Sequence, residues 1–513
     1  MHKLFGGNLG LAVKILFLSV VTALFTWMAY LALLKQEWII AGVLGLIIVA
    51  ANYIYLSKKP IAGKFLLPGV ILLILFMVVP VIYTTYMSGF IYKSGNIITK
   101  QEAIHQILTN TGLQPDENNT TYDMVLGTVG SKYTVLLTDQ NTREVYVGGD
   151  GVATKLAPGT YHLNSDGIAD SVPGFKPYND DQLANADQQI TETKESLGDH
   201  KYIVAQDAVT AALYIQTLTY DSKTNTLHNP ITGATYIDGG KGFFVNKENK
   251  TEQILPGWRQ PTWLSNYSSI FTNDRYRGPF IRVFLWTFSF AFITVIIMFG
   301  FGLVLALALD KKIRFRNIYR ALLILPYAMP SFMSILIWAG MLNRDYGSVN
   351  ALLGHHIDWL GQVWLARGAV LLVNLWLGFP YFYLISTGAI QALPSDLEEA
   401  AAIDGASGMQ IFWRIKLPLV LQILSPMLIA SFAFNFNNFN LVYLLTRGGP
   451  TNVLGGETAG GTDLLITYAY KTAFATNDQN YGLASAISVV VFVIVGGISM
   501  WSLRRSKVLE DMR

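Results

Sequence analysis

The chain has 513 residues, of which 52 percent are hydrophobic and only 14 percent are charged, and its formal net charge is +3. This composition is typical of a membrane protein and argues against an ordinary soluble globular domain. The chain has no cysteine, which excludes disulfides, thiol chemistry and zinc–thiolate sites.

Eight hydrophobic windows are long enough to cross a bilayer as helices, since about 20 mainly apolar residues suffice for one crossing. They start near Leu11, Trp38, Phe65, Phe280, Ala321, Val363, Pro418 and Leu483. The first is expected to remain as a span and not to be cleaved as a signal peptide. No small-x-small cleavage site follows it, and a second apolar run begins just after Lys35 and Glu37. The sequence therefore predicts an all-α polytopic membrane protein.

Basic residues in the short connections predict the orientation of these spans, because cytoplasmic loops are enriched in Lys and Arg. Threading the chain through eight spans places three basic clusters on one side, together with Arg414 and Lys416. The clusters are Lys58, Lys59 and Lys64; Lys311, Lys312, Arg314, Arg316 and Arg320; and Arg504, Arg505 and Lys507. This side is expected to be the cytoplasm, and both termini lie on it.

Residues 93–277 are polar and contain no spanning window. They hold 15 Lys and Arg against 21 Asp and Glu, a net charge of −6, whereas the remainder holds 22 against 13, a net charge of +9. Alternation in 133–137, 145–147 and 212–218 predicts a mainly β (α+β) domain, with helices at 102–109 and 181–194. The expected organisation is three spans in 1–92, an extracytoplasmic inserted domain in 93–277, and a core of five spans in 278–513.

The seventh span contains an unusual polar run, with four Asn among three Phe in residues 434–440. Helical spacing places Phe434, Asn435 and Asn438 toward one face. Amides can bond sugar hydroxyls without a net charge, and an aromatic face can pack on the C–H surface of a sugar ring. Asn in a membrane helix can instead bond a neighbouring helix, for about 1 kcal/mol. Four amides in six residues favour a polar path.

Two other spans contain helix-breaking residues beside polar groups. In the sixth span, Gly378 and Pro380 lie between Asn374 and Tyr381, so a kink that presents backbone carbonyls is expected there. In the fifth span, Pro326 and Pro330 flank Tyr327 and precede Ser331 in the same way. Kinks are common in membrane helices for packing alone, so each is weak evidence by itself.

Residues 395–418 predict two short helices between the sixth and seventh spans. Ser395 and Glu398 have the spacing of a capping box, Asp404-Gly405 forms a turn, and Ser407 caps a second helix. Pro418 is expected at the start of the following span, where a helix tolerates proline.

The cores of the spans contain essentially no ionisable residue, which argues against a proton- or sodium-coupled transporter. The chain also has no Walker A loop, because Gly63-Lys64 and Gly240-Lys241 lack the upstream glycine and downstream Ser or Thr of the phosphate cradle. If ATP drives this protein, another polypeptide is expected to bind it.

The spacing in residues 399–418 resembles the EAA loop of membrane subunits of bacterial ABC importers. The matching positions are Glu399, Ala400, Ala401, Gly405, Ile415, Leu417 and Pro418. Together with 432–439, 322–327, the Gly448-Gly449-Pro450 turn and the insert after the third span, this pattern is similar to the larger permease subunit of the maltose/maltodextrin importer family. The resemblance implies the type I ABC importer fold in the bacterial inner membrane and no catalytic centre, metal or cofactor.

The resemblance also implies partners and functional residues. The expected partners are a second, smaller permease, two copies of an ABC ATPase, an extracytoplasmic sugar-binding protein, maltose or maltodextrin, and membrane lipid, without nucleic acid. Contacts to sugar are implied for Tyr327, Ser331, Asn374, Leu377, Gly378, Tyr381, Phe434, Asn435 and Asn438. Coupling to the ATPase is implied for the seven EAA positions and for Asp404. Asn440 stands where the family pattern has an apolar residue, so sugar preference is expected to differ slightly.

Three other interpretations are less well supported. The protein could transport a different oligosaccharide. It could be a membrane enzyme acting through its outer domain, but Asp180, Asp181 and Glu192 have no nucleophile motif or metal cluster beside them. A sensor would need a cytoplasmic output domain, and the longest inward loop is 395–418.

Overall fold

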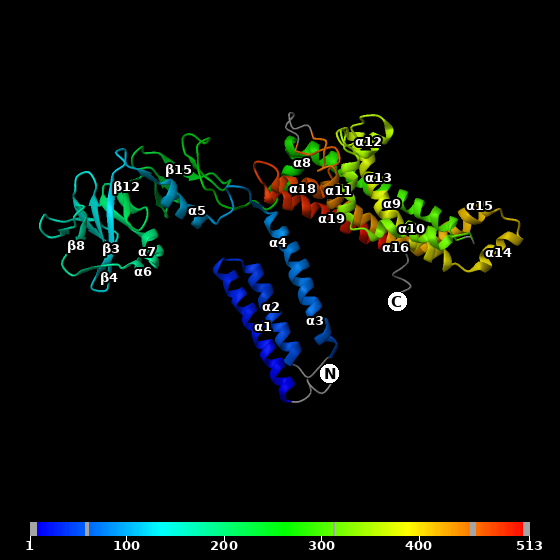
Figure 1. Cartoon of the computed structure of the whole chain (residues 1–513), viewed down its shortest axis with the longest axis horizontal. Coiled ribbons are helices and arrows are strands. Elements are labelled where there is room, and N and C mark those ends of the chain that lie inside the picture. The colour runs from blue at the N-terminus through cyan, green and yellow to red at the C-terminus, as the bar shows by residue number, and fades with distance from the viewer. Residues whose placement is uncertain (1–7, 57–60, 311–312, 452–457, 506–513) are drawn as a thin grey trace. The chain divides into compact units, whose positions relative to one another are not determined.

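The computed structural model describes residues 8–56, 61–310, 313–451 and 458–505. Two compact units divide the chain: residues 1–93 with 261–513 form a helical unit, and residues 94–260 form an inserted β-rich unit (Figure 1). Five of the basic residues that predict the orientation, Lys58, Lys59, Lys311, Lys312 and Lys507, lie outside the described residues.

The helical unit has seven described helices that are long and apolar enough to cross a membrane. They are formed by α1 (Asn8–Leu34), α2 (Trp38–Leu56), α3 (Ile61–Leu73) with η1 (Ile74–Val78) and α4 (Val79–Met87), α9 (Asp274–Ala308), α13 (Val363–Gln391), α15 (Gly408–Ile411) with η3 (Phe412–Lys416) and α16 (Leu417–Phe436), and α19 (Tyr481–Arg505). A bent pair, α10 (Arg316–Ala328) and α11 (Ser331–Met341), makes an eighth span if counted as one. The eight predicted windows correspond to these elements.

The fifth span is broken by 91° between α10 and α11. Met329 leaves the helix with a ψ of 141° because the residue before a proline, here Pro330, is sterically excluded from the helical region. The break predicted from the two prolines is therefore present.

The sixth span, in contrast, is one continuous helix: α13 runs from Val363 to Gln391 with Pro380 inside it, so the kink expected at Gly378 and Pro380 does not interrupt the helix. A single missing N–H costs a long helix only one hydrogen bond when its neighbours hold it in place. Gly378 has a packing role instead: a Cβ there would lie 2.4 Å from the Sδ and Cε atoms of Met298 on α9. The glycine thus allows close contact between α9 and α13.

The seventh span begins earlier than the sequence indicates, because α15, η3 and α16 form one continuous helix from Gly408 to Phe436. Pro418 lies inside this helix and not at the start of a separate one. The preceding turn is π-helical, with the Leu417 N–H bonded to the carbonyl of Phe412. A π turn changes the hydrogen-bond register just before the proline, which has no N–H to donate.

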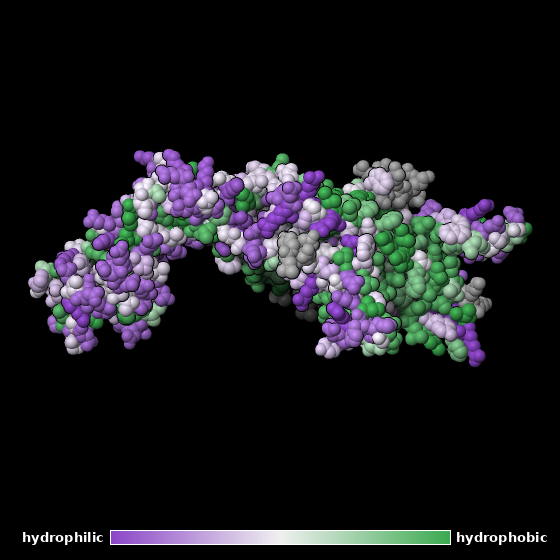
Figure 2. Space-filling model, turned by 90° about the horizontal axis from the view of Figure 1, so that it is seen from above, coloured by the Kyte–Doolittle hydropathy of each residue, from purple (hydrophilic) through white to green (hydrophobic). Residues whose placement is uncertain are grey.

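Surfaces of the two units differ in character. Large apolar side chains are exposed along the helical unit, and Figure 2 shows hydrophobic residues gathered there, whereas the surface of the inserted unit is mostly hydrophilic. The helical unit is therefore suited to lipid contact and the inserted unit to water.

The inserted unit is built on a nine-stranded sheet with the order β10-β11-β12-β3-β4-β5-β6, to which β2 and β9 add. Its strands are β2 (Leu113–Pro115), β3 (Thr121–Val129), β4 (Lys132–Asp139), β5 (Val145–Gly148), β6 (Thr154–Lys155), β9 (Phe175–Pro177), β10 (Lys194–Gly198), β11 (Lys201–Ala205) and β12 (Thr210–Gln216). The long hairpin β3–β4 pairs Val125 with Leu136, and its inner face lies in a buried cluster. The strands predicted from alternation are β4, β5 and β12.

A second sheet of five antiparallel strands runs in chain order through the inserted unit, with α5 beside it. The strands are β13 (Thr219–Asp221), β14 (Thr226–His228), β15 (Thr235–Asp238), β16 (Phe244–Asn246) and β17 (Gln253–Ile254). The helices of the unit are α5 (Lys100–Gln106) with η2 (Ile107–Thr111), α6 (Asp180–Ala184) and α7 (Asp187–Glu192), close to the two helical segments that the sequence predicts.

The compact unit ends at Gln260, whereas the sequence-based boundary is 277. The intervening residues form α8 (Ser265–Thr272) and the start of α9. Ile270 of α8 is 1% exposed and lies in a cluster with Phe280, Leu465 and Leu483 of the helical unit. These residues therefore pack with the membrane helices.

Candidate functional site

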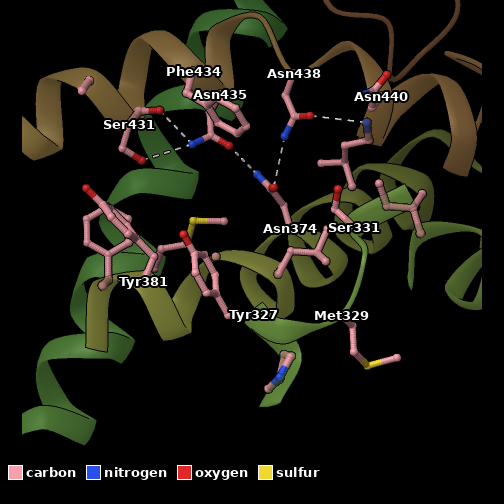
Figure 3. A pocket seen from close by; sticks show the side chains of 18 residues that line it. Tyr327, Met329, Ser331, Asn374, Tyr381, Ser431, Phe434, Asn435, Asn438 and Asn440 are labelled. Carbon is pink, nitrogen blue, oxygen red and sulfur yellow. Dashed lines mark hydrogen bonds between the residues drawn. The ribbon is translucent and has the colours of Figure 1, made fainter. Parts of the chain in front are cut away.

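A cavity of about 680 Å³ opens among α9, the α10–α11 break, α13 and the break between α16 and α17 (Phe439–Leu445). The structure brings together all nine residues for which the sequence implies sugar contacts, and each lines this cavity (Figure 3). They are Tyr327, Ser331, Asn374, Leu377, Gly378, Tyr381, Phe434, Asn435 and Asn438. The lining of the cavity contains no charged side chain among the described residues.

Three of the lining amides are bonded to one another across two spans. The Asn374 Nδ2 atom donates to Asn435 Oδ1 at 2.7 Å, and Asn438 Nδ2 donates to Asn374 Oδ1 at 3.3 Å (Figure 3). Asn435 Nδ2 also donates to the Ser431 carbonyl at 2.8 Å. Asn374 and Asn435 are only 3% and 2% exposed. They hold α13 to α16 while lining the cavity, so both interpretations of these amides apply to the same residues.

The seventh span breaks at the asparagine run. α16 ends at Phe436, and Asn438 becomes the N-cap of α17, its Oδ1 accepting from the Leu441 N–H at 3.4 Å. Asn favours this position because its side chain satisfies an N–H that has no intrahelical partner. The run thus ends α16 and begins α17, so the seventh span is interrupted at the place where it lines the cavity.

Other lining residues are exposed and can contact a ligand. Phe434 is 70% exposed and Tyr327 is 57% exposed. Asn440 is also exposed and lines the cavity, and its side chain makes no hydrogen bond to the described residues. Aromatic faces together with neutral donors and acceptors form a surface that suits a polyhydroxylated, uncharged molecule.

Several lining residues are not among the nine implied contacts, and Met298 and Ser431 are two of them. Asn440, which the sequence marks by its departure from the family pattern, also lines the cavity. Ser431 lies one helical turn before Asn435, so helical spacing alone could have identified it. Met298 comes from α9, far away in the sequence, and no local signal marks it. Asn440 belongs to the predicted polar run, but its free amide becomes evident only from the hydrogen bonds of its neighbours.

Residues 395–418, called the coupling loop after the role that the resemblance implies, contain all eight residues for which coupling is expected. α14 (Ser395–Ile403) holds Glu399, Ala400 and Ala401, while Asp404 and Gly405 form the turn, and Ile415, Leu417 and Pro418 lie in the long helix of the seventh span. Gly405 has a φ of +80°, which favours glycine. Figure 1 shows α14 and α15 projecting together at one end of the helical unit.

One helix cap was predicted correctly and one was not. Ser407 caps α15 in a capping box with Gln410, as expected. Ser395 does not cap α14, because the N-cap position is taken by Pro394 and Ser395 is already helical. Glu398 therefore does not form the predicted capping box. Its carboxylate pairs instead with Lys416 Nζ at 2.6 Å.

The coupling loop exposes large apolar side chains along its length. Ile403 is 86% exposed, Met409 66% and Trp413 60%. Several exposed large apolar groups on one loop are typical of a surface that docks against another protein.

Two family models match the chain. Residues 298–506 match the binding-protein-dependent transport system inner membrane component, and residues 71–151 match the N-terminal region of the TM subunit in PBP-dependent ABC transporters. These matches cover the cavity, the coupling loop and the start of the inserted unit.

Similar curated proteins are maltose/maltodextrin transport system permease proteins MalF. The protein from Salmonella typhi is 33% identical over 96% of this chain and 97% of its own length. Those from Vibrio cholerae and Escherichia coli K12 are 34% and 33% identical over 90% of this chain, covering 88% and 90% of their own lengths. The chain therefore belongs to the MalF family of binding-protein-dependent ABC permeases, which are multi-pass transport components of the inner membrane and not enzymes.

Proposed function

We propose that this chain is the larger permease subunit of an ATP-driven importer of maltose and maltodextrins, and that the cavity is its sugar site. The observation that supports this most directly is the convergence of Tyr327, Tyr381, Phe434 and the amides on one uncharged cavity. Its volume lies within the roughly 300–1,000 Å³ of small-molecule sites. Neutral amides and aromatic faces bind sugar hydroxyls and C–H surfaces without a charged group.

The proposed complex contains a second, smaller permease, two copies of an ABC ATPase and an extracytoplasmic sugar-binding protein. One chain supplies one coupling loop, so two ATPase subunits require two permeases. Because the basic clusters mark the cytoplasmic side, the coupling loop faces the cytoplasm, where ATP is available. Both termini lie on that side, and the inserted unit faces outward, where it helps to hold the binding protein.

Transport follows from alternating exposure of the cavity. Closure of the ATPase pair draws the coupling loops together and moves the spans that meet at the cavity. The sugar is then exposed first to the outer side and afterwards to the cytoplasm. Energy comes from the partner, while Gly405 and the EAA positions transmit the movement.

Uptake by the complete complex in proteoliposomes tests this function. We expect ATP-dependent accumulation of labelled maltose and longer maltodextrins, with much less of a disaccharide that contains no α-1,4-linked glucose pair. Accumulation of the unrelated disaccharide in preference to maltodextrins would instead favour a permease for another oligosaccharide.

A further inference from the structure

The second coupling helix and the cavity lie on a single helical rod. The continuous helix from Gly408 to Phe436 has 29 residues. At 1.5 Å per residue it is about 43 Å long. Its first turn belongs to the coupling loop, and its last turn contributes Phe434 and Asn435 to the cavity. Movement of this end of the loop is therefore transmitted directly to the cavity.

The first coupling helix has no such direct connection. α14 joins α13 through residues 392–394 and joins the rod through the turn at Gly405, whose Cβ position has no neighbouring atom within 4 Å. Both connections are short non-helical segments about which α14 could swing. A force applied to α14 alone would move α14 without moving the rod, unless another contact held the two together.

Such a contact exists at the base of the loop. Glu398 in the first turn of α14 pairs with Lys416, the residue immediately before α16, at an N–O distance of 2.6 Å. The two side chains are 38% and 20% exposed, so the pair is partly shielded from water. Among the described residues, no second ion pair joins α14 to the rod.

We infer that Glu398 and Lys416 are positioning residues that fix α14 to the rod, so that both coupling helices move with the seventh span. The inference rests on the proposed transport function. Exposed ion pairs usually add little to stability. This pair has a mechanical role: it joins the open end of a hairpin whose other end is the turn at Gly405.

Charge reversal in the complete complex tests the inference. Glu398→Lys or Lys416→Glu places like charges together, and each is expected to lower the number of sugar molecules moved per ATP hydrolysed by about three- to fivefold. The double reversal restores the opposite pair and should return this ratio to within about twofold of the parent. A purely structural role would alter the amount of assembled complex and leave this ratio unchanged.

Asp396→Lys is the matched control, because Asp396 lies in the same turn of α14 and makes no ion pair with the described residues. The same charge change there is expected to leave the coupling ratio within about twofold of the parent. Single reversals without effect, or a double reversal as poor as the single ones, would overturn the inference.

Failure of the proposed function is separable from failure of this inference. It would appear as absence of maltodextrin uptake by the parent complex. The ATPase rate of the assembled complex without sugar or binding protein, compared between the same variants and the parent, would then decide the role of the ion pair, since this measurement requires no transported sugar. Recovery of this rate by the double reversal supports the inference, and no recovery overturns it.

Discussion

Asn440 differs from the other amides around the cavity in having no hydrogen-bond partner within the described part of the chain. Asn374, Asn435 and Asn438 bond one another or a helix end, whereas the Asn440 side chain is exposed at the cavity without a hydrogen bond to the described residues. A neutral side chain with a free donor and a free acceptor can bond a sugar hydroxyl without first breaking a protein contact.

Replacing Asn440 with Ala tests this difference. The loss of one neutral hydrogen bond, worth about 1 kcal/mol, should raise the maltodextrin KM about fivefold while the complex still assembles. Concentration-dependent uptake in proteoliposomes measures the effect. Asn437→Ala is the control, because the Asn437 Nδ2 atom donates to the Ala433 carbonyl and the residue does not line the cavity. Equal KM values for both variants would contradict a ligand contact at Asn440.

Glu195, in the inserted unit, is a buried carboxylate in an unfavourable setting. It is 2% exposed, one oxygen accepts from the Gly149 N–H at 2.9 Å, and the other, Oε2, has no partner among the described residues. Burial raises the pKa of the Glu195 carboxyl above its usual value, because desolvation disfavours the charged form.

The raised pKa of Glu195 predicts a dependence of stability on pH. The folded unit binds this proton more tightly than the unfolded chain does, so stability falls as the pH rises from the ordinary carboxyl pKa through the raised one. Glu195→Gln keeps the oxygen that accepts from Gly149 and removes the buried charge. The variant should melt at a higher temperature than the parent at pH 7 and at a similar temperature near pH 4. Thermal unfolding followed by circular dichroism at both pH values measures this. A lower melting temperature at pH 7 would contradict the prediction.

The sequence predicts which residues surround the cavity better than it predicts what each one does. All nine contacts implied by the family resemblance line the cavity, and helical spacing by itself places three of them, Phe434, Asn435 and Asn438, on one face. The division between bonded amides and the free Asn440 depends on the distance between α13 and α16, which no local pattern encodes.

At the scale of elements, the contact of α9 with α13 links helix packing to the size of the cavity. Gly378 lies against Met298, and both residues line the cavity. Because Met298 has a flexible side chain, an added methyl group at position 378 can be accommodated by displacing it.

Gly378→Ala should therefore impair transport more than stability. Alanine improves helix propensity by about 1 kcal/mol, which offsets much of the packing strain, but the displaced Met298 side chain reduces the space for sugar. We expect uptake of long maltodextrins to fall more than uptake of maltose. Adding Met298→Ala should restore the long substrates, as measured by competition between sugars of different length. No recovery in the double variant would contradict this explanation.

The turn of the coupling loop can be tested at Gly405. Its φ of +80° is unfavourable for a β-branched residue, and no atom of this chain lies within 4 Å of an added Cβ, so within the chain Gly405→Val acts through the backbone. The cost is about 1–2 kcal/mol. Uptake and stimulated ATPase activity should fall together while the complex remains assembled.

Gly408→Ala is the control for that variant, because Gly408 has equally open surroundings and no positive φ. It should behave like the parent in both assays. Unchanged uptake by Gly405→Val would exclude the turn as a coupling element.

Local signals predict helix ends unevenly. Ser407 and the break at Pro330 agree with the structure because a cap and a pre-proline residue act within a few positions. Ser395 does not, because Pro394 already occupies the N-cap. Pro380 does not end its helix, since α13 continues beyond it to Gln391. The failure at Ser395 has a local cause, whereas packing against α9 supports α13 around Pro380.

For the whole molecule, the β character of the insert follows from alternation and polarity, whereas its boundary does not. The first residues of the segment 261–277 are no more hydrophobic than the inserted domain that precedes them. Their membership of the helical unit depends on the contacts of Ile270 and Tyr267 with Phe280 and distant helices. A boundary set by contacts far away in the sequence cannot be read from composition.

The position of this boundary predicts that two fragments of the chain differ in solubility and stability. Residues 94–260 contain two buried clusters of their own and no cysteine, so this fragment should fold cooperatively as a soluble monomer under reducing or oxidising conditions. The fragment 93–277 carries α8, whose Ile270 would lose its buried surroundings and become exposed, so it should associate or precipitate more readily. Thermal unfolding and sedimentation of both fragments measure the difference. If 94–260 were unfolded, or if 93–277 were the more stable and soluble of the two, the inserted unit would need α8 to complete its fold.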